Sequence, residues 1–105
     1  MKNADLIIAE RKRQISAEGI SSYEDDMYES GELIDAALSY LKAAALQARG
    51  EDQKCLDTLA DAGIVPWPWE NKWWKPSDQK RNLVKTGALI LAELDRLERL
   101  ENDAH

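Results

Sequence analysis

The sequence predicts an all-α fold, a compact bundle of about four helices with a Trp/Pro-rich extended connector before the last helix. Apolar residues recur at the 3.6-residue spacing of a helix, and no stretch is a candidate strand. The three prolines are confined to residues 66–76, where they exclude a helix interior. A chain of 105 residues fits one domain with a single core.

The first helix is expected from Asn3, which can cap it, to Glu18, with Gly19 as a stop. The apolar stripe of this helix is thin, so the helix should pack at the edge of the bundle. That stripe consists of Ala4, Ile8, Arg11 and Ile15. The basic run at residues 11–13 is interpreted as a solvated face that pairs with nearby acids.

A long helix should follow residues 20–30, which are a charged connection or a helix start with a capping box at Ser22 and Asp25. Gly50 is its expected terminator. Its inward stripe is expected to be Leu33, Ile34, Ala37, Leu38, Leu41, Ala44, Ala45 and Ala48. A shorter helix over residues 51–62 should face inward with Cys55, Leu56, Leu59 and Ala60.

The last helix is expected from the cap at Ser77 and Asp78 to about Asn102. Its inward face is expected to be Leu83, Val84, Gly87, Ile90, Leu91, Leu94 and Leu97. Glycine in a helix costs about 1 kcal/mol relative to alanine. We therefore expect a backbone or a tryptophan ring to approach Gly87 closely.

All four tryptophans lie in the connector, and basic residues follow or interleave them. Aromatic planes beside cations suit a nucleotide, because a base stacks on the ring and its phosphate needs positive charge. The alternative is that the rings fold back onto the bundle with the lysines lying over them, which we expect for at least two rings. The predicted ligand- or partner-binding residues are Trp67, Trp69, Lys72, Trp73, Trp74, Lys75, Arg81 and Lys85.

The first half of the chain is acidic, with no lysine or arginine between Gln14 and Leu41. If the long helix begins near Asp25, then Asp25, Glu29 and Glu32 share one face and Asp35 extends it. A hard cation such as Mg²⁺ would relieve their repulsion, which makes Glu29, Glu32 and Asp35 candidate metal ligands. The alternative is a solvated acidic face, favoured by the helix dipole or paired with basic residues 11–13.

Several classes are disfavoured by composition. The net charge of −6 argues against non-specific nucleic-acid binding. A single cysteine excludes an internal disulfide, and no signal peptide or membrane-length apolar run is present, so a cytoplasmic protein is expected. The only histidine is His105, which removes histidine-dependent nucleophilic catalysis.

A set of motifs resembles a family of small, largely uncharacterised proteins carried by bacteriophages and prophages, and spans nearly the whole chain. The matching motifs are Glu10-Arg11-Lys12-Arg13-Gln14, Asp25-Asp26, Gly31-Glu32-Leu33, Trp67-Pro68-Trp69, Trp73-Trp74-Lys75-Pro76 and residues 83–93. The resemblance implies a phage accessory role, such as binding a host factor or blocking a bacterial defence system.

A more distant similarity is to the all-α MazG-type nucleoside triphosphate pyrophosphatases, in which Glu-x-x-Glu and Glu-x-x-Asp pairs hold Mg²⁺. Glu29 and Glu32 match the first pair. The second pair has no counterpart in its expected place, because Glu32-x-x-Asp35 lies on the same helix and Asp95-x-x-Glu98 has the reversed order.

Two functions follow as hypotheses. The preferred one is a non-enzymatic binding protein whose partner is a host or defence-system protein or a nucleotide, with no cofactor and with a homodimer among the expected states. The alternative is a Mg²⁺-dependent nucleotide pyrophosphatase, in which Lys75 or Arg81 contacts phosphate. Incubation with nucleoside triphosphates and Mg²⁺ separates the two. A DNA mimic built on the acidic half is weaker, because the second half is basic.

Overall fold

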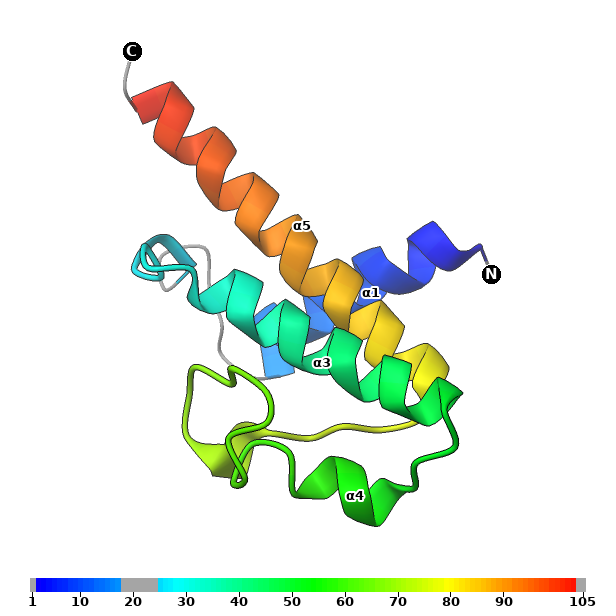
Figure 1. Ribbon diagram of the computed structural model, residues 1–105. Coiled ribbons are helices and arrows are strands. Elements are labelled where there is room, and N and C mark those ends of the chain that lie inside the picture. Colours follow the sequence, from blue (N-terminus) through cyan, green and yellow to red (C-terminus); the bar gives the residue numbers. More distant parts are fainter. Residues whose placement is uncertain (1, 18–24, 104–105) are drawn as a thin grey trace.

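Four α-helices and one 3-10 turn make up the described part of the chain (Figure 1). This computed structural model describes residues 2–17 and 25–103. Its elements are α1 (Asn3–Ala17), α3 (Glu32–Ala48), α4 (Gln53–Asp57), η1 (Asn71–Trp73) and α5 (Gln79–Asp103). None of these residues forms a strand, so the all-α prediction is confirmed. The predicted stop at Gly19 and the Ser22 half of the capping box lie outside the described residues.

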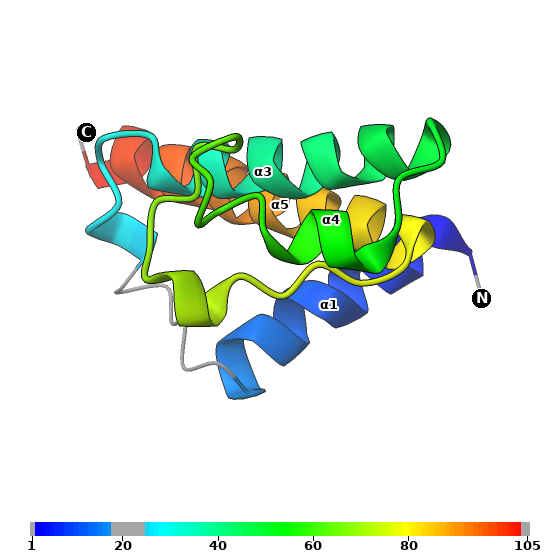
Figure 2. The ribbon, with the colours of Figure 1, turned by 60° about the horizontal axis from the view of Figure 1, so that its bottom comes forward.

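The helices form two layers around α5, which packs on both α3 and α1. Helices α3 and α5 lie side by side and run in opposite directions, while α1, α4 and the connector (residues 66–78) cover the other side of this pair (Figure 2). The core lies between these layers. It is built mainly from Leu33, Ala36, Ala37, Tyr40, Ala43, Leu56, Leu59, Val65, Trp74, Leu89 and Ala92.

The inward faces of α3 and α5 differ from those predicted. On α3, Leu33, Ala37 and Ala44 are buried as predicted, but Ile34, Leu38 and Leu41 are 44–48% exposed. On α5, only Val84 of the predicted set is buried, whereas Leu83, Ile90, Leu94 and Leu97 are 40–58% exposed. The physical reason is the run of small residues on each helix: Ala36, Ala37, Ala43 and Ala44 face Ala88 and Ala92, which lets the two backbones approach closely. The larger aliphatic side chains are left on the outside.

The inward face of α1 also differs from the prediction. Ile8 and Ile15 are 45% and 39% exposed, and the buried residues are instead Glu10, Arg11 and Gln14. Lys12 is exposed as expected for a solvated face, but Arg11 is buried in an ion pair with Asp25. The basic run is therefore only partly a surface feature.

Gly87 marks the crossing of α1 over α5. A Cβ atom built on Gly87 would lie 2.7 Å from Cδ1 of Ile7, so the missing side chain leaves room for α1. The predicted close approach at Gly87 therefore exists, but it is made by an isoleucine side chain and by neither a backbone nor a tryptophan ring.

The turn into α4 follows the prediction, whereas the length of α4 does not. Gly50 adopts a φ of 94°, a left-handed conformation that suits glycine, and the chain turns away from the axis of α3 there. The Asp52 carboxylate caps α4 by accepting from the backbone N–H of Cys55 at 3.0 Å. Only residues 53–57 are helical, and turns carry the chain on to Gly63, so Leu56 and Leu59 are buried while Cys55 is half-buried.

Candidate functional site

Three tryptophans of the connector, Trp67, Trp69 and Trp74, form one aromatic cluster with two tyrosines. Tyr40 of α3 stacks on Trp74, with centroids 4.8 Å apart, and meets Trp67 edge-on at 5.5 Å. Trp67 in turn contacts Trp69, which contacts Tyr28. Such pairs contribute about 0.5–1.5 kcal/mol each beyond the area they bury. The cluster therefore anchors the connector to α3.

Hydrogen bonds join the connector to α4 and α5 and also link residues within it. Trp74 Nε1 donates to the carbonyl of Leu56 at 2.9 Å, and Trp67 Nε1 donates to the carbonyl of Glu70 at 3.1 Å. Near α5, the buried amide of Asn82 accepts from the N–H of Ser77 at 2.8 Å and donates to the carbonyl of Ser77 at 2.9 Å. A segment fixed in this way presents its remaining surface in a set geometry, which suits a binding site.

A pocket of about 480 Å³ opens between the connector and the helices. Its volume falls within the roughly 300–1,000 Å³ of small-molecule sites. The connector supplies Trp67, Pro68, Trp69, Glu70 and Trp73 to its walls. The remaining walls come from Glu10, Arg13 and Gln14 of α1, from Tyr28 and Tyr40, and from Lys85 and Leu89 of α5.

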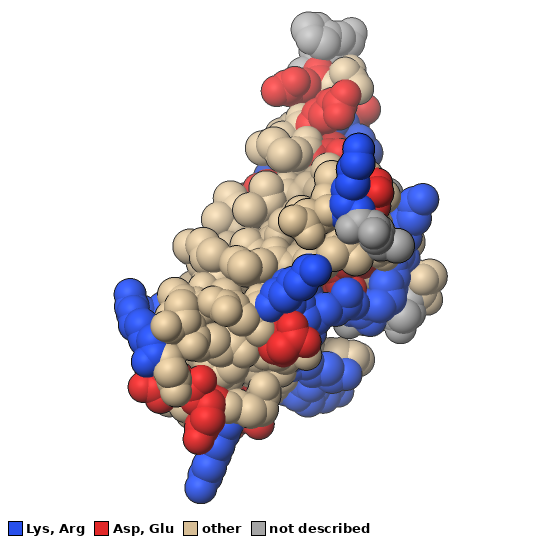
Figure 3. All heavy atoms as spheres, turned by 90° about the vertical axis from the view of Figure 1, so that its right-hand side faces the viewer, with Lys and Arg blue, Asp and Glu red and all other residues tan. Residues whose placement is uncertain are grey.

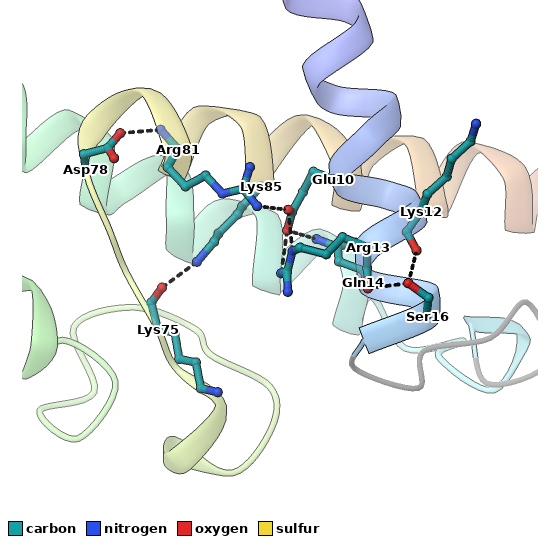
Figure 4. Close-up of polar contacts among 9 residues, drawn as sticks. All are labelled: Glu10, Lys12, Arg13, Gln14, Ser16, Lys75, Asp78, Arg81 and Lys85. Carbon is teal, nitrogen blue, oxygen red and sulfur yellow. Dashed lines mark hydrogen bonds and ion pairs between the residues drawn. The ribbon is translucent and has the colours of Figure 1, made fainter.

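Charged groups gather at the α1–α5 side of this pocket (Figure 4). The carboxylate of Glu10 is fully buried and accepts two hydrogen bonds from Arg13, both at 2.8 Å, and one from Arg81 across the helix crossing. Burial by itself raises the pKa of Glu10, but the hydrogen bonds and charges of Arg13, Arg81 and Gln14 hold the pKa below its ordinary value of 4.5. Glu10 is thus an anion that orients two arginines.

Lys85 links the same charged group to the connector. Its Nζ donates to the carbonyl of Lys75 at 2.7 Å and lies 5.1 Å from the centre of the Tyr40 ring. The ammonium of Lys85 is thereby placed at the boundary between the aromatic walls and the arginines. A ligand with a flat apolar part and an anionic part meets both kinds of surface here.

Two polar groups of the pocket walls are buried with no hydrogen-bond partner among the described residues: Gln14 Oε1 and Trp69 Nε1. The orientation of the Gln14 amide follows from its neighbour, because its Nε2 donates at 3.3 Å to Glu10, whose carboxylate can only accept. The amide oxygen is therefore left as an acceptor, and the Trp69 indole as a donor. A buried polar group without a partner typically costs about 1–3 kcal/mol, which a ligand could recover.

The predicted binding residues divide into three groups. Trp67, Trp69, Trp73 and Lys85 line the pocket. Lys72 and Lys75 lie beside it, with their ammonium groups 5.4 and 5.5 Å from the centre of the Trp73 ring. Trp74 is buried in the core, and Arg81 lies beneath the pocket on Glu10. Trp74 together with the half-buried Trp67 and Trp69 matches the expectation that at least two rings fold back, while Trp73 is 48% exposed.

The predicted acidic row does not exist as one face. Gly31 has a φ of 88° and α3 begins only at Glu32, so Asp25 and Glu29 precede the helix. Asp25 is buried against Arg11, and burial raises its pKa although Arg11 opposes this; Asp26 pairs with Arg99 at 2.8 Å. Asp25 and Asp26 therefore each have a cationic partner.

The predicted metal ligands Glu29, Glu32 and Asp35 do not come together. Glu29 borders a hollow that Arg96 and Arg99 also line, which is a poor setting for a cation. The carboxylate of Glu32 accepts from the backbone N–H of Ser30 at 2.7 Å. Across residues 2–17 and 25–103, no three His, Cys, Asp or Glu side chains form a group that could hold a metal ion.

The contribution of α1 to the pocket is not among the features predicted from the sequence. Glu10, Arg13 and Gln14 lie at i, i+3 and i+4, which is the spacing of one helical face, and this polar pattern was the available signal. Because a charged run on a helix is usually solvated, this pattern by itself does not indicate a pocket. Tyr28 and Tyr40 carried no comparable signal.

None of the described helices has both the length and the apolar composition needed to cross a lipid bilayer.

Comparison with known proteins adds no assignment. No family model, no curated protein and no solved structure gives a significant match to this chain, so the two resemblances remain predictions from the sequence.

Proposed function

We propose that the protein binds a nucleotide in the pocket between the connector and α1, with the base among the aromatic rings and the phosphates near Arg13 and Lys85. One observation carries the proposal: an aromatic pocket contains a buried acceptor, Gln14 Oε1, and a donor, Trp69 Nε1, that no described residue satisfies. A nucleobase is flat and presents donors and acceptors along its edge. Its flat face suits the rings of this pocket, and its edge meets either atom once the Gln14 or Trp69 side chain shifts to expose that atom.

Stacking on Trp73 is energetically feasible although Lys72 and Lys75 already lie over that ring. An exposed cation–π contact contributes about 0.5–1 kcal/mol, whereas stacking of a base on an aromatic side chain contributes about 1–3 kcal/mol. A base that displaces one lysine from the ring therefore gains on balance. The displaced ammonium stays close enough to attract a phosphate.

The charges beside the pocket favour an anionic ligand. Arg13 and Lys85 line the pocket together with two acids, Glu10 and Glu70. The positive excess comes from three cations beside it: Lys72, Lys75 and Arg81. Two nitrogens of the Arg13 guanidinium bond to Glu10, which fixes this cation at the pocket wall, where its charge attracts a phosphate. The base and the phosphate thus have separate partners within one pocket.

Titration with nucleoside mono- and triphosphates, followed by tryptophan fluorescence and calorimetry, tests the proposal. We expect saturable quenching, weaker binding of the phosphate-free nucleosides, and an affinity that falls with salt. Trp73→Ala should reduce the quenching, with Trp67 and Trp69 still reporting on the pocket, and should weaken the calorimetric affinity. Arg13→Gln should weaken the binding of nucleotides more than the binding of nucleosides. The control is Lys12→Gln, which alters the exposed neighbour of Arg13 and should change neither affinity.

Absence of binding to every nucleotide at millimolar concentration would remove this function. The same samples, supplemented with Mg²⁺ and analysed for hydrolysis products, test the alternative pyrophosphatase. No specific observation favours turnover, so binding is the proposal; turnover that is lost in Glu32→Gln would reverse this choice. A host or defence-system protein as partner remains a prediction.

A further inference from the structure

The two longest helices carry apolar stripes that face neither the core nor the pocket. On α3, Ile34, Leu38 and Leu41 are spaced i, i+4, i+7, and on α5 Leu83, Ile90, Leu94 and Leu97 follow the same heptad-like spacing. Each of these seven side chains is 40–58% exposed. We call these seven residues the outer face.

The two stripes form one surface because of how α3 and α5 pair. Thr86 Oγ1 donates to the carbonyl of Ala37 at 3.4 Å, and Gln79 Nε2 donates to the carbonyl of Ala44 at 3.3 Å. In antiparallel helices this register places Leu83 level with Leu41, and Ile90 level with Ile34. Figure 3 shows the side of the molecule on which a broad strip without charged side chains runs between basic residues and the acidic end of α5.

The size of the outer face suits the apolar centre of a stable interface. At 1.5 Å per residue the α5 stripe is about 21 Å long and the α3 stripe about 10 Å long. With helices about 10 Å wide, the footprint is on the order of 300 Å². Large contiguous apolar patches rimmed by polar residues mark interaction sites. A standard interface buries about 800 Å² per partner, with an apolar centre and a polar rim.

A second copy of this chain is the occupant that fits the pattern. The stripes on α3 and α5 have the same period. A second copy related by a two-fold axis therefore presents the same side chains and the same spaces between them, and the two α3–α5 pairs pack as four helices. The ends of α5 are also complementary: Lys80 lies ten residues before Ile90 and Glu101 eleven residues after it. Antiparallel pairing of two α5 helices about Ile90 brings Lys80 of one copy toward Glu101 of the other.

We infer that the outer face is the interface of a homodimer. The connector, which supplies one wall of the pocket, covers the other side of the α3–α5 pair (Figure 2), so dimerisation through the outer face leaves both pockets open. This inference does not depend on the proposed function.

Sedimentation equilibrium and light scattering of the full chain at micromolar concentration test it. We expect twice the chain mass of 11.9 kDa. Ile90→Glu should give the mass of one chain, because the two-fold axis places the new carboxylate against its own copy and should raise the dissociation constant more than about 100-fold. Leu38→Lys on α3 is the second variant, with circular dichroism to check that both remain folded.

Ile64→Glu is the matched control, since Ile64 is 58% exposed but lies outside the outer face, and it should leave the mass unchanged. A single-chain mass for the unaltered protein overturns the inference and leaves the face to a different partner. A dimer that persists in both folded variants overturns it as well, since the contact must then lie elsewhere.

Discussion

Replacing Glu10 by glutamine should destabilise the fold far more than the same replacement of an exposed glutamate. The carboxylate of Glu10 is fully buried and accepts from Arg13, Gln14 and Arg81. Breaking a buried ion pair costs about 3–5 kcal/mol when the remaining charge has no access to water. Here the side chains of Arg13 and Arg81 are 39% and 37% exposed, so water recovers part of their solvation. We therefore expect a loss of about 2 kcal/mol, toward the lower values for hydrogen bonds to charged groups.

The pH dependence gives this prediction a sign that a purely steric effect lacks. Because the pKa of Glu10 is held below 4.5 in the folded protein, its ionised form favours folding. This stabilisation is complete above the ordinary pKa and disappears as the pH falls through the lowered one. The difference between the unaltered protein and Glu10→Gln should thus be largest near neutral pH and should shrink below about pH 4.5.

Urea unfolding followed by tryptophan fluorescence between neutral and acid pH measures both effects. Glu70→Gln is the control: its carboxylate is 74% exposed and lies 3.6 Å from Lys72, so its loss should be below about 1 kcal/mol. Equal losses for Glu10→Gln and Glu70→Gln at neutral pH, or a Glu10→Gln loss independent of pH, would refute the electrostatic account.

A triple replacement of Glu10, Arg13 and Arg81 by methionine separates lost attraction from stranded charge. Replacing a complete buried ion group by apolar residues is often neutral or stabilising. The triple variant should therefore recover at least half of the stability lost in Glu10→Gln, while nucleotide binding disappears. A triple variant as unstable as the single one would mean that the cluster itself holds α1 on α5.

The other predictions concern packing. Trp74→Ala should lower the free energy of unfolding by about 3–5 kcal/mol, because a ring that is only 7% exposed is lost and the carbonyl of Leu56 loses its donor. Trp73→Ala should lower it by less than about 1 kcal/mol, since the Trp73 ring is half exposed. The midpoints of urea unfolding compare the two variants. Gly87→Ala should destabilise by about 1–2 kcal/mol despite the better helix propensity of alanine, because three atoms of Ile7 lie within 3.3 Å of the new Cβ. Ile7→Ala in the same chain should relieve this loss in a double-mutant cycle, and additive losses would contradict the crossing geometry.

The helices and the pinned connector could be predicted because their signals are local. Helical periodicity in α3 and α5, the stop at Gly50 and the prolines beside the tryptophans all act within a few residues. The exposed Trp73 and the buried Trp74 are neighbours in sequence, so no local signal separates them. Their difference arises from Tyr40 and Leu56, which meet Trp74 only in the folded chain.

The inward faces could not be predicted because α3 and α5 each carry two apolar stripes. One stripe is small, with Ala37 and Ala44 on α3, and the other is large, with Leu38 and Leu41. Hydrophobic periodicity favours the larger side chains, whereas close packing of two helices favours the smaller ones. If the outer face is a dimer interface, both stripes are buried in the assembly, and the sequence pattern reports the assembly as well as the single chain.

The α1 helix presents the same problem in the reverse direction, and this is the strongest argument that its inner face serves a function. An inward stripe of Ile8 and Ile15 would bury apolar surface at no electrostatic cost, yet the helix turns Glu10 and Gln14 inward instead. Glu10 becomes tolerable through Arg13 on the same helix and through Arg81, which lies 71 residues away in the sequence. Burying a charge and leaving Gln14 Oε1 unsatisfied both oppose stability. Two of the four buried side-chain atoms that lack a partner among the described residues belong to residues that line this pocket, as does the buried Glu10. Such departures from the packing rules are expected where a chain is shaped by a ligand as well as by its own folding.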